Sequence, residues 1–209
     1  MSQVPIKTVL EVTLVADGSS DRVLVPIIES VFDVYCRDRP FVVRFADGVH
    51  HGPLVERLVQ AMQLFPCDIL LVHRDAEGEA LVVREAEIAN AVQQAGATIQ
   101  RVNVVPVRMT ESWLLLDAAA IRSASGNPHG QVALDLPTAA TVEKVVGAKD
   151  ALFVALETAS ELSARRRRRF DRNQARQRVA QLLDFKLLRT LSSFRHFEKQ
   201  VTDLFDPRA

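Results

Sequence analysis

Residues 8–20 read TVLEVTLVADGSS, and this stretch decides the fold class of the chain. Residues 8–16 form a β-branched apolar run, which is typical of a strand buried on both faces. The turn residues Asp17 and Gly18 end the run. After this turn, apolar residues recur at helical spacing as far as Phe32, so the segment predicts a strand, a turn and a helix in that order.

The same pattern returns along the next hundred residues. Further strands are expected at residues 41–46, 68–73 and 98–107, and helices at residues 54–65 and 79–94. Regular alternation of strands and helices predicts parallel strands joined by right-handed helical crossovers. The expected fold class is therefore α/β, with a doubly wound, Rossmann-like parallel sheet flanked by helices. Its functional residues should gather at the carboxyl ends of the strands.

Three parts of the chain are distinguished by composition. Residues 1–122 are expected to form the α/β domain, and residues 123–137 (SASGNPHGQVALDLP) form the clearest loop. Nothing beyond that loop has the pattern of a strand. Residues 138–209 are expected to be a helical extension packed on the α/β domain, with helices at residues 142–163, 173–188 and 194–205.

The overall composition excludes several classes of protein. The chain has 209 residues, of which 48% are hydrophobic and 25% charged, so an intrinsically disordered or fibrous chain is not expected. Cys36 and Cys67 are too few for a disulfide scaffold, and buried or half-buried thiols are expected. Residues 1–7 lack a secretory signal, and no apolar run is long enough to span a membrane. The expected location is the cytoplasm.

The charged residues are unevenly distributed, although 26 Lys and Arg balance 26 Asp and Glu. Residues 1–150 hold 13 basic and 19 acidic side chains, a net charge of −6, and residues 151–209 hold 13 and 7, a net charge of +6. Such an asymmetry fits cation binding by the acidic part and nucleic-acid contact by the basic part. Two solvated surfaces are the alternative.

Five consecutive arginines stand out in the basic part. Five residues of a helix turn through about 500°, so these side chains cannot all point in one direction. The segment is either solvated or a surface that contacts phosphates. The candidate nucleic-acid-binding residues are Arg165, Arg166, Arg167, Arg168, Arg169 and Arg172.

Acidic residues follow three of the expected strands. Asp17, Asp75, Glu77 and Glu111 lie at or shortly after the expected carboxyl ends, which a parallel sheet brings to one edge. Clustered carboxylates repel one another unless a cation or protons compensate. Oxygen ligands favour hard cations, so Mg²⁺ or Mn²⁺ is the expected cofactor. Each acid taken alone is equally typical of a turn or a helix cap.

Four stretches resemble a known family. Residues 14–22 (LVADGSSDR) resemble the strand-acid-Gly-x-x-Asp motif of TOPRIM domains, the topoisomerase and primase fold, and residues 70–79 (LLVHRDAEGE) resemble its later acid-x-acid pair. Residues 105–117 (VPVRMTESWLLLD) and 191–197 (LSSFRHF) are similar to two signatures of a TOPRIM-like bacterial family of unknown function, often encoded beside ABC-type ATPases. Together the four stretches span most of the chain in the expected order.

The resemblance implies a Mg²⁺-dependent nuclease that cleaves phosphodiester bonds in DNA or RNA, and DNA is expected before RNA. It would serve a bacterial anti-phage defence or DNA-repair system together with a separate ATPase. In such a nuclease Asp75 and Glu77 would bind Mg²⁺, and Asp17 would be a further ligand or the general base. Asp21 would bind metal through water or orient its loop, and Glu111 would be an auxiliary ligand.

Gly18 and Ser19 complete the implied site as the point where the backbone approaches a phosphate. Two departures from the TOPRIM pattern favour a second hypothesis. Asp17 stands where glutamate is usual, and Glu77 stands where a second aspartate is usual. A second register of the acid pair would use His73 and Asp75 instead.

The second hypothesis is a non-catalytic binding or regulatory subunit with a degenerate TOPRIM fold, again a partner of an ABC-type ATPase. A receiver-like phosphoryl-transfer domain is a third hypothesis, and a homo-oligomer is compatible with all three. His50 and His51 are a candidate phosphate or metal contact, with a plain polar loop as the alternative. Trp113 is expected in the core, and Lys149 lies where some TOPRIM nucleases place a catalytic lysine. The chain has neither a GxxxxGK[ST] phosphate loop nor a GxSxG elbow.

Overall fold

The computed structural model describes residues 9–206, so the segment inspected for a secretory signal, residues 1–7, lies outside it. Its strands are β1 (Leu10–Val15), β2 (Phe41–Phe45), β3 (Ile69–His73) and β4 (Gln100–Val104). All four expected strands are confirmed, each with narrower bounds because the turn residues at the ends leave the ladder.

The helices fall into an early and a late set. Those between the strands are α1 (Leu24–Tyr35), α2 (Leu54–Leu64) and α3 (Leu81–Gln94), with the 3₁₀ turn η1 (Ser19–Val23) before α1. Those after β4 are α4 (Glu111–Leu114), α5 (Ala118–Ala124), η2 (Val142–Lys144), α6 (Ala148–Ala159), α7 (Ala164–Arg167), α8 (Arg172–Leu182), α9 (Phe185–Leu188) and α10 (Ser192–Phe205). Pro26 is the third residue of α1, in the first turn, where its missing N–H costs no intrahelical bond.

The sheet is parallel throughout, in the order β2-β1-β3-β4. In its register Val12 lies opposite Val43 on one side and Ile69 on the other, and Leu71 lies opposite Val102. Every residue of β3 is buried, as expected of a central strand covered on both faces. The α/β fold class with a Rossmann-like layout is therefore confirmed.

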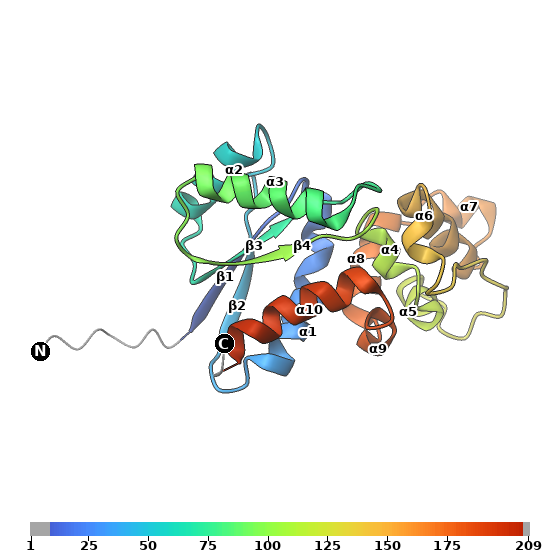
Figure 1. The fold of residues 1–209 in the computed structure, drawn as a ribbon. Helices are drawn as coiled ribbons and strands as arrows, with labels where there is room; N and C mark the ends of the chain where they lie inside the picture. The colour runs from blue at the N-terminus through green and yellow to red at the C-terminus, as the bar shows by residue number, and fades with distance from the viewer. Residues whose placement is uncertain (1–8, 207–209) are drawn as a thin grey trace, which may run out of the picture. The chain divides into compact units, whose positions relative to one another are not determined.

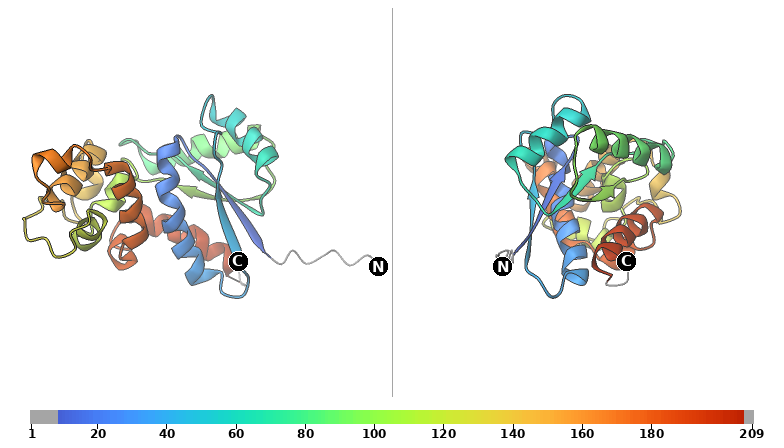
Figure 2. Two further views of the ribbon diagram at one scale, coloured as in Figure 1. Left: turned by 180° about the vertical axis from the view of Figure 1, so that it is seen from behind. Right: turned by 60° about the vertical axis from the view of Figure 1, so that its left-hand side comes forward.

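Helices cover both faces of this sheet (Figures 1 and 2). α2 and α3 lie on one face, and α1 lies on the other together with the later part of α10. On the second face, Phe32 of α1 contacts Phe41 of β2 at a centroid distance of 5.6 Å and Phe205 of α10 at 5.7 Å. The two faces follow from the topology, because right-handed crossovers that run in opposite directions along a sheet place their helices on opposite sides.

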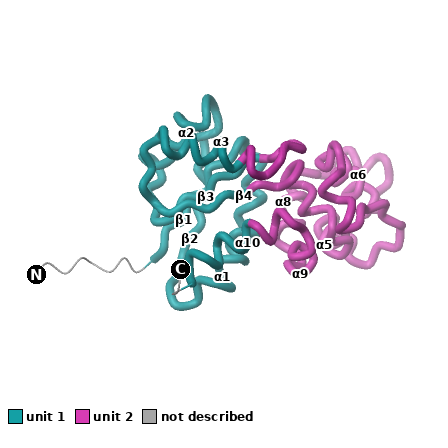
Figure 3. The backbone as a smooth tube through the Cα atoms, in the orientation of Figure 1, with its two compact units in different colours: residues 1–74, 85–104, 197–209 teal, residues 75–84, 105–196 magenta. Residues whose placement is uncertain are grey.

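The chain divides into two compact units that differ from the expected domains (Figure 3). Unit 1 consists of residues 1–74, 85–104 and 197–209, and unit 2 of residues 75–84 and 105–196. The last helix thus ends in the unit that holds the sheet. A sequence pattern marks changes in local structure along the chain, whereas the units are defined by contacts between distant segments. The expected boundaries at residues 122 and 138 therefore differ from the boundaries of the two units.

The helix expected over residues 142–163 is interrupted. The structure has the short turn η2 and then α6, separated by Gly147. Gly147 is the N-cap of α6 and has a φ of 71°, a left-handed conformation that glycine adopts without strain. Similarly, residues 173–188 form α8 and α9, because Asp184 caps a new helix by accepting a hydrogen bond from the Lys186 N–H.

Cys36 and Cys67 form no disulfide within the described residues, and the two thiols are buried and half-buried as expected. Burial raises the pKa of the Cys36 thiol, while the nearby Arg39 lowers it in part. Among the described residues, no helix combines the length and the apolar character that a membrane crossing requires.

Candidate functional site

The carboxyl ends of β1 and β3 are adjacent in the sheet, and the chain leaves them toward opposite edges. This is the topological switch point, where open α/β sheets bind their ligands. Asp17 follows β1 and Arg74 follows β3. Unit 1 therefore places a carboxylate and a guanidinium at the position where the fold predicts a site.

Asp17 is paired with two arginines. Arg57 Nη1 lies 2.9 Å from Asp17 Oδ1, and Arg74 Nε lies 2.9 Å from Asp17 Oδ2. Arg57 also donates to the Ala16 carbonyl, and Arg74 donates to Glu87. The Asp17 side chain is 38% exposed, whereas that of Arg57 is 6% exposed. Both oxygens of this carboxylate thus already face a positive charge.

Arg57 is a site residue that the sequence reasoning missed. It lies on the buried side of α2, next to Leu54, Leu58 and Ala61, which repeat at the spacing of a helix that packs on a sheet. A charged residue inside such an apolar stripe is unusual, because burying a charge is costly unless it is paired. This signal is visible in the sequence and could have identified Arg57.

Asp21 and His73 form a second pair in unit 1. Asp21 Oδ2 accepts a hydrogen bond from the Gly18 N–H at 2.9 Å and lies 3.8 Å from His73 Nε2. His73 is fully buried, and its Nδ1 lies 2.9 Å from the Val104 carbonyl oxygen. The Gly18 N–H, expected to approach a phosphate, is thus bonded within its own turn, while Ser19 is exposed.

Asp75 and Glu77 follow β3 in unit 2, and Glu77 lies in a turn. Glu77 and Gly78 have φ values of 54° and 95°. A Cβ at Gly78 would lie 3.1 Å from a guanidinium nitrogen of Arg108. The backbone conformation therefore favours glycine here, and a larger residue would also displace the tip of the Arg108 side chain.

The two acids of this turn differ in their surroundings. Asp75 is half-buried, and its Oδ1 accepts a hydrogen bond from the Thr110 N–H at 3.0 Å. Glu77 is exposed, and within residues 9–206 its carboxylate has no hydrogen bond or ion pair. Asp75 thus helps to hold two loops of unit 2 together, whereas the Glu77 side chain is free to contact a ligand.

Glu111, the expected auxiliary metal ligand, is part of a buried ion pair. Its Oε1 accepts a hydrogen bond from Arg176 Nη1, and the two side chains are 7% and 3% exposed. Arg176 lies on the buried side of α8 beside Ala175 and Val179. The pair joins α4 to α8 inside unit 2, so in this conformation Glu111 acts as a structural acid.

Two of the family-like motifs meet in the core of unit 2. Trp113 is fully buried, as expected, and its Nε1–H donates to Ser193 Oγ at 2.9 Å. Phe194 packs edge-on against the Trp113 ring, with centroids 5.3 Å apart. Ser193 in turn donates to Glu143. The signatures around residues 113 and 193 therefore form one packed cluster.

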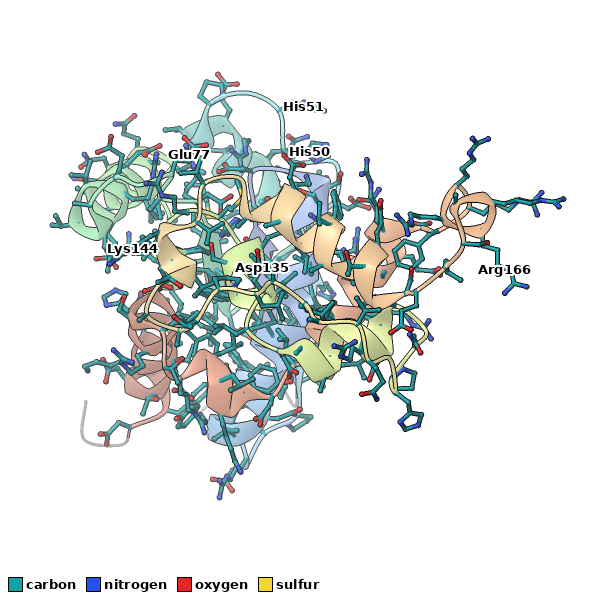
Figure 4. All side chains as sticks on the ribbon, turned by 90° about the vertical axis from the view of Figure 1, so that its right-hand side faces the viewer. His50, His51, Glu77, Asp135, Lys144 and Arg166 are labelled. Atoms are coloured by element: carbon teal, nitrogen blue, oxygen red, sulfur yellow. The ribbon has the colours of Figure 1, made fainter. Side chains whose placement is uncertain are left out.

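The arginine run lies at the surface of unit 2. Residues 165–169 are all exposed, in α7 and the turn that follows. Arg166 projects outward from α7 (Figure 4). Arg172 is partly engaged, since its guanidinium lies 4.7 Å from the centre of the Phe153 ring and 3.9 Å from Glu157.

The remaining candidates are the two histidines after β2 and Lys149. The rings of His50 and His51 lie 4.5 Å apart in the loop after β2 of unit 1, with His50 half-buried and His51 exposed. Lys149 is half-buried in α6 of unit 2.

Comparison of the chain with protein-family models, with curated proteins and with solved structures gave no significant match. The fold and the site therefore define a class only: an α/β protein with a parallel sheet, one ion-paired carboxylate at its switch point and a basic helical unit. The TOPRIM-like assignment stays a prediction from the sequence.

The acids assigned to Mg²⁺ or Mn²⁺ do not fit a metal ion in this conformation. Both oxygens of Asp17 face arginines, and Asp21 Oδ2 accepts a backbone hydrogen bond. Across residues 9–206, no three His, Cys, Asp or Glu side chains gather closely enough to hold a metal. A hard cation needs several free oxygen ligands, and here guanidinium groups occupy the place of the cation at Asp17.

Proposed function

We propose that the protein binds nucleic acid through an arginine-rich surface on unit 2, with DNA as the expected ligand before RNA. The observation that carries this proposal is a set of exposed arginines without acidic partners in the described part of the chain. Its members are Arg165, Arg166, Arg168, Arg169 and Arg178. Contacts from such side chains to phosphates supply most of the affinity for nucleic acid that is independent of base sequence.

The charge distribution between the units supports this proposal. Unit 2 holds 16 Lys and Arg against 12 Asp and Glu, a net charge of +4, and unit 1 holds 10 against 14, a net charge of −4. Within unit 2 the excess is concentrated at residues 165–178, which contain eight arginines and one aspartate. A local excess of this size attracts a polyanion and raises its association rate.

We expect binding to single-stranded DNA to depend strongly on salt. Five phosphate contacts give a slope of about −3.5 in a plot of log affinity against log salt concentration. Fluorescence anisotropy with an oligonucleotide of about 12 nucleotides measures this slope. In the variant Arg165→Gln/Arg168→Gln the magnitude of the slope should fall by about 1.4. Absence of binding at about 50 mM salt, or a slope near zero, would contradict the proposal.

The ion pairs at the switch point favour a binding subunit over an enzyme. Arg57 and Arg74 neutralise the Asp17 carboxylate at this edge of the sheet, so in this conformation Asp17 is not available as a metal ligand or a general base. Such a subunit would bring nucleic acid to a separate ATPase, the partner that the TOPRIM-like resemblance implies.

Mg²⁺-dependent cleavage of DNA or RNA is the second candidate function, and one observation favours it. Glu77 follows the central strand β3, is exposed and has no partner among the described residues, so its carboxylate is available.

The cleavage hypothesis is best tested at Glu77, because Asp75 also stabilises its loop. If the protein is a nuclease, Glu77→Gln should lower cleavage with Mg²⁺ or Mn²⁺ by at least about 100-fold, the scale on which a catalytic group acts. Glu79→Gln, an exposed position in the same turn, is the matched control. Equal rates for the native protein and both variants would assign any cleavage to a contaminant and leave the binding function standing.

A further inference from the structure

A pocket of about 280 Å³ lies in unit 2 at the beginning of α8. Its lining includes Arg166, Arg169 and Arg178, together with Gln174, Phe170 and Asp171. The lining also includes Ser125, the C-cap of α5, whose hydroxyl lies within hydrogen-bond distance of the Ile121 and Leu156 carbonyl oxygens. The pocket thus combines three cationic side chains, one amide and one aromatic ring.

The pocket has a net positive charge in its own lining. None of its three arginines has an acidic partner within residues 9–206. The single acid, Asp171, is engaged as the helix cap of α8, where its Oδ1 accepts hydrogen bonds from the N–H groups of Asn173 and Gln174. Three arginines and one aspartate leave a formal charge of +2 that no group of the described chain neutralises.

This charge distinguishes between two forms of phosphate. A phosphodiester inside a strand carries one negative charge, whereas a terminal phosphomonoester carries about −1.5 to −2 near neutral pH and offers three acceptor oxygens. Arginine is suited to such a group, because its planar fork can donate two hydrogen bonds to one phosphate. A pocket with a charge of +2 therefore favours the monoester over the diester.

Only some arginines of residues 165–169 line the pocket. Arg166 and Arg169 are three residues apart and both contribute to it, whereas the lining does not include Arg165 or Arg168. Arg165 and Arg168 are also exposed, so they can contact the strand outside the pocket.

We propose that this pocket binds the terminal phosphate of a nucleic-acid strand. Arg166, Arg169 and Arg178 bind the phosphate oxygens, and Phe170 offers an apolar surface to the adjoining nucleoside. The exposed arginines outside the pocket contact the phosphodiesters that follow. This inference rests on the proposed nucleic-acid binding and adds that strand ends are the preferred ligand.

The test compares oligonucleotides of one sequence that differ only at their ends. Fluorescence anisotropy is measured with a 5′-phosphate, with a 3′-phosphate and with hydroxyl groups at both ends. We expect the native protein to prefer one phosphorylated form by about tenfold, as one or two extra charge-assisted hydrogen bonds give. Arg169→Gln/Arg178→Gln should abolish this preference. Arg165→Gln/Arg168→Gln should weaken all three oligonucleotides equally and keep the preference.

The outcomes separate this inference from the proposed function. Equal affinity of the native protein for all three oligonucleotides would overturn the pocket assignment and leave general nucleic-acid binding intact. A preference that survives Arg169→Gln/Arg178→Gln would also overturn it. Absence of binding to every oligonucleotide would refute both proposals. Competition by a nucleoside monophosphate identifies the source of the phosphate. If a competitor at the same concentration as the oligonucleotide removes the preference, the pocket is a site for free nucleotides instead of strand ends.

Discussion

Replacing Arg176 with methionine is expected to destabilise unit 2 by about 3–5 kcal/mol. The substitution removes the guanidinium that pairs with the Glu111 carboxylate, and both side chains are almost fully buried. Methionine fills a similar volume but leaves a buried carboxylate without a counter-ion, which costs far more than the ion pair itself contributes. Because Trp113 is the single tryptophan and lies in unit 2, its fluorescence during denaturation with urea reports on this unit.

Two further variants make the result specific. Arg178→Met changes an exposed arginine on the same helix and should alter the free energy of unfolding by no more than about 0.5 kcal/mol. Glu111→Met/Arg176→Met replaces both charges and should recover most of the loss, since a buried pair exchanged for apolar side chains is often neutral. If Arg176→Met and Arg178→Met have the same free energy of unfolding, the ion pair between Arg176 and Glu111 does not stabilise unit 2.

Replacing Trp113 with alanine is expected to destabilise the same unit by about 3–5 kcal/mol. The indole is fully buried and packs edge-on against Phe194, so alanine leaves a large cavity. The hydrogen bond from its Nε1–H to Ser193 Oγ is lost as well. Since the variant lacks the fluorescent probe, far-UV circular dichroism during denaturation measures the change.

Trp113→Phe and Ser193→Ala divide this loss between packing and hydrogen bonding. Phenylalanine keeps much of the buried area, and we expect a smaller loss of about 1–2 kcal/mol. Ser193→Ala leaves the indole N–H without its acceptor and should cost about 1–3 kcal/mol. A Trp113→Ala variant within about 1 kcal/mol of the native protein would contradict the structural role given to this motif.

The strands and their order of appearance could be predicted because they depend on local patterns. The apolar runs of β1 and β3 alternate with helical segments, which is typical of a covered, parallel sheet, and the turn residues after them mark where each strand ends. The end of β3 could be predicted for the same reason, because Ile69–His73 is buried throughout and Asp75 lies beyond it.

The partners of the acids could not be predicted in this way. Arg57 reaches Asp17 from a helix 40 residues further along the chain, and Arg176 reaches Glu111 from 65 residues away. Ion pairs of this kind depend on how α2 packs on the sheet and how α8 packs on α4. The sequence shows only that a charge lies in an apolar stripe and therefore requires a partner.

By itself the sequence determined the α/β class, the positions of the acids after the strands and the basic character of the C-terminal part, because periodicity and charge are local properties. Only the tertiary structure decided that guanidinium groups neutralise Asp17 and Glu111, and that two arginines of the run join Arg178 around one pocket. These features depend on the distances between side chains that are far apart in the chain, and packing alone sets those distances.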